Sequence, residues 1–134
     1  MLNWGMAKQV YKILIVDDNP DVVELIKESL DLIDTVRFEF IVCDNGQLGY
    51  IRAKEHLPNL IFLDVKMPRW DGYQAYENLM ANDATSGIPV VFITALHEKD
   101  DILKAKTLKI KHYIVKPFDI ETIIKKTKEI LGIA

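Results

Sequence analysis

Five short apolar runs alternate with segments of helical periodicity along this chain of 134 residues. The runs lie at residues 12–16, 38–43, 60–63, 89–93 and 112–115. Alternation of strand and helix is typical of α/β proteins, because two neighbouring parallel strands need a long crossover connection, usually a helix. At this length one domain can bury roughly two-thirds of the surface of its unfolded chain. The pattern therefore predicts a single α/β domain with a five-stranded parallel sheet.

The segments between the runs predict five helices. Asn19 is a suitable cap and Pro20 a suitable first residue for the first helix, whose apolar positions recur as far as Ile33. The other helices are expected at about 48–57, from Asp71-Gly72 to about Asn82, from about His97 to Leu108, and over 120–131 with Gly132 ending the last one. Run 38–43 alternates polar and apolar residues, which predicts an edge strand.

Residues with useful chemistry follow four of the five runs. Asp17 and Asp18 come after the first run, Asp64 after the third, Thr94 after the fourth and Lys116 after the fifth. Parallel strands end at one edge of the sheet, and ligands of open α/β sheets bind outside that edge. The sequence therefore predicts that these side chains share one site.

Three converging carboxylates repel one another unless a cation lies between them. Magnesium suits such a group, because it binds one or two carboxylates and completes its coordination with water and phosphate oxygens. Mn2+ is the expected substitute. Lys116 can pair with an oxygen that the metal does not hold, and the Thr94 hydroxyl can donate to a phosphoryl oxygen. Together these groups favour a site for phosphoryl transfer.

Composition excludes several other classes of protein. The formal net charge of −3 argues against wholesale binding of nucleic acid or membranes. The single cysteine, Cys43, precludes an internal disulfide and is expected to be a small buried residue of a strand. Residues 1–11 lack the apolar stretch of a secretory signal, and we expect them to form an N-terminal extension to a domain at 12–134 in a cytoplasmic protein.

Four segments together resemble the receiver domain of response regulators in two-component signalling. They are Ile15-Val16-Asp17-Asp18-Asn19, the stretch from Leu63 to Gly72, Ile93-Thr94-Ala95, and the stretch from Tyr113 to Phe118. They occur in the order and spacing of that family and span residues 12 to 131. The resemblance implies a flavodoxin-like doubly wound (βα)5 fold with strand order 2-1-3-4-5, the order of the chemotaxis receiver.

The resemblance also implies a role for each matching residue. Asp64 would accept a phosphoryl group from a histidine kinase or histidine phosphotransfer protein, in a signalling domain that catalyses its own phosphorylation and slow dephosphorylation rather than in an enzyme. The metal ligands would be Asp18, Asp17 through water, Asp64 and the backbone carbonyl of Lys66. Lys116 would contact the phosphoryl oxygens, and Thr94 with Tyr113 would form the switch that reshapes the face made by the fourth helix, fifth strand and fifth helix.

Two departures from the family pattern stand out. Many receivers have a Gly-Ala pair before the fifth strand, whereas this chain has Leu108-Lys109-Ile110-Lys111, so the fourth helix lacks a glycine with which to end. The residues two positions after Asp64 and Thr94 are Lys66 and Leu96, and neither has a carboxylate or amide to orient an attacking water.

Other interpretations compete with the phosphorylated receiver. A dehalogenase-type phosphatase needs a carboxylate at the position of Lys66, and a flavodoxin needs Ser, Thr and Gly where this chain has Asp17-Asp18-Asn19-Pro20. A pseudo-receiver, which is a scaffold that is not phosphorylated, is the main alternative. We expect the switched face to bind either a protein partner or a second copy of the chain. The receiver would be free-standing or would belong to a larger regulator. No direct contact with nucleic acid or membrane is expected.

Overall fold

The computed structural model describes residues 7–95 and 99–134, which form ten elements of secondary structure in strict alternation. Each strand is followed by a helix, as the sequence predicts. The elements are β1 (Val10–Val16), α1 (Pro20–Asp31), β2 (Arg37–Cys43), α2 (Gly46–His56), β3 (Leu60–Asp64), α3 (Gly72–Ala81), β4 (Val90–Thr94), α4 (Lys99–Thr107), β5 (His112–Val115) and α5 (Ile120–Leu131). Within these residues, no helix is both long enough and apolar enough to cross a bilayer.

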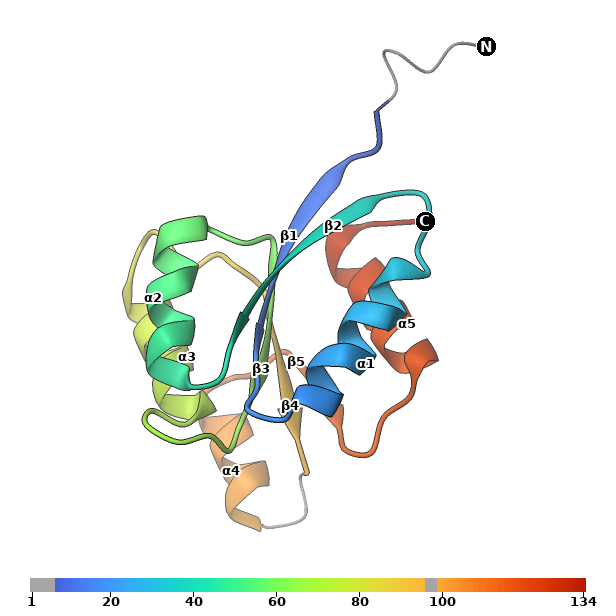
Figure 1. Cartoon of the computed structure of the whole chain (residues 1–134). Helices are drawn as coiled ribbons and strands as arrows, with labels where there is room; N and C mark the ends of the chain where they lie inside the picture. The colour runs from blue at the N-terminus through green and yellow to red at the C-terminus, as the bar shows by residue number, and fades with distance from the viewer. Residues whose placement is uncertain (1–6, 96–98) are drawn as a thin grey trace.

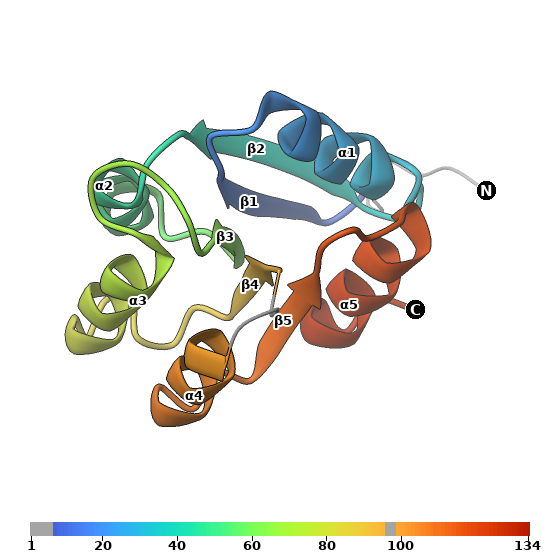
Figure 2. The same ribbon diagram turned by 90° about the horizontal axis from the view of Figure 1, so that it is seen from below.

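All five strands are parallel and lie in the order β2-β1-β3-β4-β5. Helices α1 and α5 cover one face of the sheet, and α2, α3 and α4 lie on the other side (Figures 1 and 2). This arrangement confirms the predicted flavodoxin-like topology, with β2 as an edge strand. Cys43 is buried at the end of β2, also as predicted.

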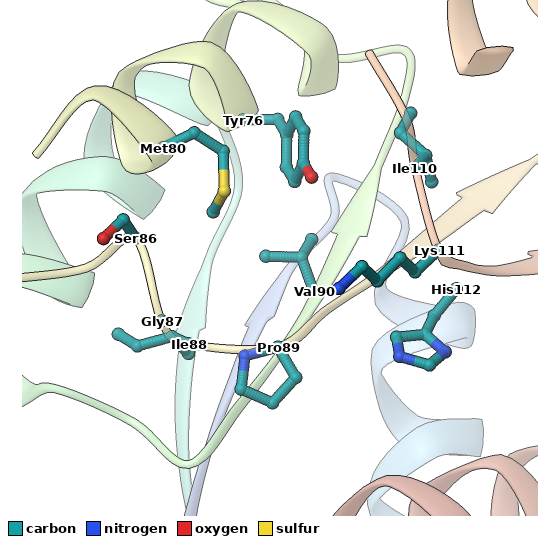
Figure 3. A pocket seen from close by; sticks show the side chains of 10 residues that line it. All are labelled: Tyr76, Met80, Ser86, Gly87, Ile88, Pro89, Val90, Ile110, Lys111 and His112. Carbon is teal, nitrogen blue, oxygen red and sulfur yellow. The ribbon is translucent and has the colours of Figure 1, made fainter.

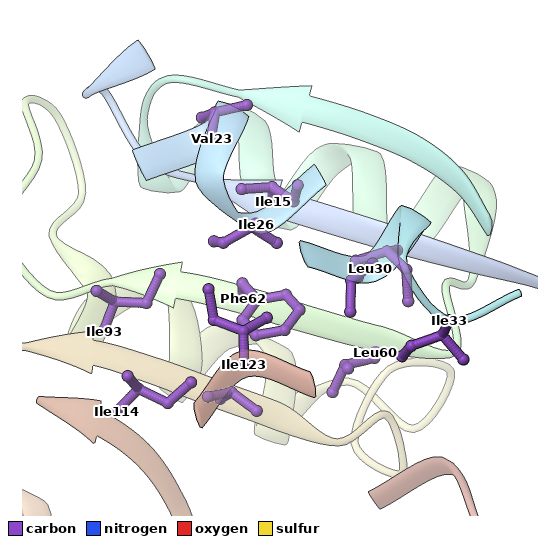
Figure 4. Close-up of a cluster of buried hydrophobic side chains, with 12 residues drawn as sticks. Ile15, Val23, Ile26, Leu30, Ile33, Leu60, Phe62, Ile93, Ile114 and Ile123 are labelled. Atoms are coloured by element: carbon purple, nitrogen blue, oxygen red, sulfur yellow. The ribbon is translucent and has the colours of Figure 1, made fainter. Parts of the chain in front are cut away.

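The sheet has a separate apolar core on each face, because successive side chains of a strand point to opposite sides. On the face covered by α1 and α5, Ile15, Phe62 and Ile93 of three adjacent strands pack with Ile26 of α1 and Ile123 of α5 (Figure 4). The second core packs Leu14, Leu63 and Phe92 against the inner sides of α2 and α3. Residues of β1, β3 and β4 are therefore buried on both faces, which explains their nearly continuous apolar runs.

The predicted boundaries differ from the structure mainly at strand starts and helix ends. β1 begins at Val10, two residues before the apolar run, because its first residues pair with β2 from Arg37 onward. α1 ends at Asp31 rather than near Ile33. α2 begins at Gly46, capped by the Asn45 side chain, so it starts earlier than the apolar pattern predicts. α4 is described from Lys99, and the predicted start near His97 lies outside the described residues.

The end of α4 shows how this chain replaces the missing glycine. Lys109 has a φ of 55°, in the left-handed region, and the Ile110 amide donates to the Ala105 carbonyl at 3.0 Å. The Lys109 amide donates to the Lys106 carbonyl at 3.1 Å. A residue with a Cβ adopts this conformation at a cost of roughly 1–2 kcal/mol. The helix therefore ends in the usual left-handed geometry without the residue that favours it.

We expect Lys109→Gly to stabilise the protein. Relief of the left-handed strain exceeds the extra entropy that glycine gives the unfolded chain, so the free energy of unfolding should rise by about 0.5–1 kcal/mol. Urea denaturation followed by circular dichroism measures the change. Lys106→Gly, inside α4, is the matched control and should destabilise by about 1 kcal/mol. Equal destabilisation by both substitutions would contradict this account of the helix end.

Candidate functional site

Parallel pairing brings the ends of β1, β3, β4 and β5 to one edge of the sheet. Asp17 and Asp18 directly follow β1, Asp64 is the last residue of β3 and Thr94 the last residue of β4. Ligand oxygens of Asp17, Asp18 and Asp64 all lie within 4.8 Å of one another. The structure thus brings together the three carboxylates that the sequence places at this edge.

Asp17 is the most buried member of this acidic cluster, with 2% of its surface exposed. Its Oδ1 accepts a hydrogen bond from the Asn19 amide at 2.8 Å, whereas its buried Oδ2 has no hydrogen-bond partner among the described residues. Burial raises the pKa of Asp17 to about 6, and the nearby Asp64 charge adds to the shift against the opposing Asn19 hydrogen bond. A buried carboxylate oxygen of this kind is a suitable ligand for a cation.

Asp64 lies at the centre of the site, 5% exposed. Burial raises its pKa above the ordinary value, and the ammonium of Lys116 opposes that shift. Lys116 Nζ lies 3.4 Å from Asp64 Oδ1, and the backbone amide of Lys66 also donates to the Asp64 carboxylate. The Lys116 side chain remains about one-third exposed, so one end of this ion pair faces solvent. The Asp64 carboxylate is thus nearly enclosed, with the partly exposed Lys116 ammonium on its solvent side.

Two glycines set the course of the loop between β3 and α3. The Gly72 amide donates to the Val65 carbonyl at 2.8 Å, and a Cβ on Gly72 would lie 2.3 Å from the Asp64 carbonyl oxygen. The Gly46 amide donates to the Trp70 carbonyl at 3.1 Å, and a Cβ on Gly46 would lie 2.2 Å from the Trp70 carbonyl oxygen. Only glycine permits these approaches. The starts of α2 and α3 therefore fix the loop that follows Asp64.

Thr94 and Tyr113, the predicted switch residues, border a small cavity behind the acidic cluster. Thr94 is buried, whereas Tyr113 is 47% exposed on the edge strand β5. The cavity has a volume of about 10 Å³ and is also lined by Tyr73, Phe92 and Ile110. Tyr73 stacks on Phe92 with ring centroids 5.8 Å apart. An aromatic ring moving inward from β5 would need these side chains to shift.

The donor set of the acidic cluster fits a hard divalent cation. It consists of carboxylate oxygens only, one of them buried without a hydrogen-bond partner in the described part of the chain, and such oxygens are the ligands that Mg2+ prefers. Because Asp18 is exposed, water can reach the group and complete the coordination of an ion. The residues present therefore fit a magnesium ion.

Sequence reasoning found the side chains of the site but missed the backbone groups that hold them. The Asn19 amide on Asp17 is an Asx turn, for which the signal is an aspartate two residues before the amide. The Lys66 amide on Asp64 and the close approach of Gly72 depend on loop geometry that no residue pattern specifies. Leu96, the other residue expected beside the site, lies outside the described residues.

Comparison with known proteins places the chain in a family. Residues 13–128 match the model of the response regulator receiver domain. The chain belongs to this receiver family. The receiver is 31% identical over 121 residues to protein PilH of Pseudomonas aeruginosa, covering 90% of this chain and 98% of PilH. The chain spans about half the length of several other curated regulators that it matches.

Two solved structures illustrate the likeness of the fold. The receiver domain of sensor histidine kinase PA1611 from P. aeruginosa, solved with a magnesium ion coordinated in its active site cleft, has a TM-score of 0.80 at 22% identity and covers 91% of this chain and 98% of its own. The phosphorylated cyanobacterial phytochrome response regulator RcpA has a TM-score of 0.78 at 27% identity, with 92% and 96% covered. This receiver is thus a signalling domain of two-component systems.

The raised pKa of Asp17 predicts a pH dependence of stability in the absence of divalent metal. Because the folded-state pKa of about 6 exceeds the unfolded value near 3.8, the folded protein binds the extra proton, and this stabilisation is lost as pH rises through 6. Between pH 4 and pH 7 the free energy of unfolding of the parent should fall by on the order of 1–3 kcal/mol relative to that of Asp17→Asn, whose amide cannot titrate. Urea unfolding of both proteins with chelator present measures the difference. Parallel pH profiles of stability for the parent and Asp17→Asn would contradict a raised pKa of Asp17.

Proposed function

We propose that this receiver accepts a phosphoryl group on Asp64 from a histidine kinase or histidine phosphotransfer protein, and that phosphorylation reshapes the face formed by α4, β5 and α5. The observation that carries the proposal is the arrangement around Asp64. A buried carboxylate at a strand end lies next to Asp17 and Asp18 and 3.4 Å from the ammonium of Lys116. The phosphorylated relative RcpA supports the same function.

In the proposed reaction, a carboxylate oxygen of Asp64 attacks the phosphorus of a phosphohistidine. A P–O bond forms as the P–N bond breaks, and the imidazole of the donor leaves with the electron pair and takes up a proton. Lys116 is placed to pair with a phosphoryl oxygen as the Asp64 charge is spread over the acyl phosphate. The Lys66 amide, which donates to Asp64 before transfer, orients the attacking carboxylate.

Asp17, Asp18 and Asp64 would hold Mg2+, or Mn2+ in its place, together with the backbone carbonyl of Lys66. The ion supplies positive charge that offsets the negative charge of the carboxylates and of the incoming phosphoryl group. Asp17, held by the Asn19 amide, is in position to orient the ligands from the buried side.

Asp64→Asn should take up no phosphoryl group from acetyl phosphate in the presence of magnesium, because the amide lacks the nucleophilic oxygen. Intact-mass spectrometry of parent and variant after the same incubation measures the uptake. Asp83→Asn, the same chemical change at an exposed turn, is the matched control and should be labelled like the parent. Equal labelling of Asp64→Asn would overturn the assignment, and an unlabelled parent would favour the phosphorylation-independent pseudo-receiver.

Magnesium should stabilise the fold, because it offsets the repulsion within the acidic cluster. At a concentration 100 times its dissociation constant the gain is about 2.7 kcal/mol, and thermal melts with and without the ion measure it. Asp18→Asn should reduce the gain, and without metal it should be more stable than the parent, since one repelling charge is removed. A melting temperature that is unchanged by millimolar magnesium would contradict the metal site.

The face proposed for output combines exposed apolar residues with basic ones. Leu103, Tyr113 and Val115 are 60%, 47% and 41% exposed. The basic residues proposed for this face are Lys104, Lys106, Lys109, Lys111, Lys125 and Lys126. Such a surface suits an acidic partner or an acidic patch on a second copy, so its binding should weaken as salt shortens the Debye length below about 8–10 Å.

Beryllofluoride, which mimics a phosphoryl group on aspartate, should shift NMR signals across α4 and β5 as well as around Asp64. The movement joins Thr94 and Tyr113 to the modified carboxylate, and these residues lie on adjacent strands. Lys116→Ala is the control variant: it should bind magnesium yet show weaker shifts in β5, because the ammonium couples the phosphoryl oxygens to that strand. Shifts confined to the surroundings of Asp64 would exclude this face as the output.

A further inference from the structure

A cavity of about 240 Å³ lies at the edge of the sheet opposite the acidic cluster. It opens between α3, the turn before β4 and the segment that leads into β5 (Figure 3). Pro89 and Val90 line it at the start of β4, whereas Thr94 and the phosphoacceptor edge lie at the other end of that strand. The cavity is therefore separate from the site of phosphorylation.

The cavity is lined by both apolar and polar side chains, and the polar ones are those of Tyr76, Ser86, Lys111 and His112. Met80, Ile88 and Val90 contribute apolar surface. The Lys111 side chain reaches toward the cavity from the segment before β5, and the Tyr76 ring extends from α3 with its hydroxyl directed into the same space (Figure 3). In the described part of the chain, neither Lys111 nor Tyr76 has a recorded salt bridge or side-chain hydrogen bond. The exposed Lys111 ammonium and the half-buried Tyr76 hydroxyl are thus two donors at the cavity without an acceptor among the described side chains.

We propose that this cavity binds a small organic carboxylate with an apolar body, held by Lys111 and the Tyr76 hydroxyl over the apolar wall. A carboxylate provides an acceptor oxygen for each of the two donors, and a charge-assisted contact to an ammonium is stronger than a neutral one. The volume is below the range of drug-sized ligands, which points to a molecule of roughly ten heavy atoms.

The charge of the cavity favours a monoanion over phosphate. Burial and the neighbouring Lys126 and Lys111 charges hold the pKa of His112 below its ordinary value, so the imidazole is uncharged at neutral pH. Burial also raises the pKa of Tyr76, so the phenol keeps its proton as a donor. Lys111 is then the single positive charge among the lining residues, which matches the single negative charge of a carboxylate better than the higher charge of phosphate at neutral pH.

The position of the cavity also connects it to the predicted switch. Ile110 lines both this cavity and the small one beneath Thr94 and Tyr113. Tyr76 packs edge-on against Phe92 with ring centroids 5.1 Å apart, and Phe92 lines the small cavity as well. A ligand here would touch the apolar side chains that an inward movement of Tyr113 must displace.

Titration of the whole chain with benzoate, benzamide and benzamidine, followed by amide NMR, tests the proposal. The three probes share one shape and differ in charge. Benzoate should shift the signals of Gly87, Val90, Ile110 and His112 and bind at least tenfold more tightly than benzamide, with benzamidine weakest. The parent without magnesium or phosphoryl donor is sufficient, so the outcome does not depend on whether Asp64 is phosphorylated.

Lys111→Met keeps the apolar stem of the side chain but removes its charge, and it should abolish the preference for benzoate. Lys109→Met removes an equal charge two residues away, outside the cavity lining, and should keep the preference. Equal binding of benzoate and benzamide, shifts located elsewhere, or an unchanged preference in Lys111→Met would overturn the proposal. Inorganic phosphate binding as tightly as benzoate would refute the requirement for an apolar body.

Discussion

The parallel register of β1, β3, β4 and β5 is the constraint on which the site depends. Val16 pairs with Leu63, Asp64 with Ile93, and Thr94 with Val115, so consecutive strands end within a residue or two of one another. A slip of one residue would exchange the two faces of a strand and move each side chain from the core that it fits into the other one. Burial on both faces therefore fixes the register, and the register in turn brings the carboxylates together.

Bringing the carboxylates together at this edge leaves Asp17 buried with little to offset its charge. Asp17 is held by one amide while its second oxygen is left without a partner in the described structure, and its pKa rises to about 6. Such a group destabilises a fold that has no cation to offset it. The same feature would make the proposed site sensitive to a bound cation or phosphoryl group, because either would change the charge beside a buried carboxylate.

Much of the fold and the site could be predicted from the sequence, since both follow from periodicity. Apolar runs located the strands, and the residue after each run gave Asp17, Asp64 and Lys116. What the sequence did not reveal depends on backbone geometry. The left-handed turn at Lys109 is imposed by tertiary packing on a residue that disfavours it, and the cavity beside Lys111 arises from the spacing of three elements. Neither has a periodic signal.

The two glycines at the starts of α2 and α3 make one side of the site stiffer than the other. Gly46 and Gly72 bring backbone against backbone on the β3–α3 side, so movement there would break hydrogen bonds and create overlap. On the side of β4 and β5, the Thr94 carbonyl accepts a hydrogen bond from the Lys116 amide, and side chains rather than backbone close off the small cavity beside the exposed Tyr113. A displacement at Asp64 would therefore meet fixed backbone on one side and side chains, which can change rotamer, on the other.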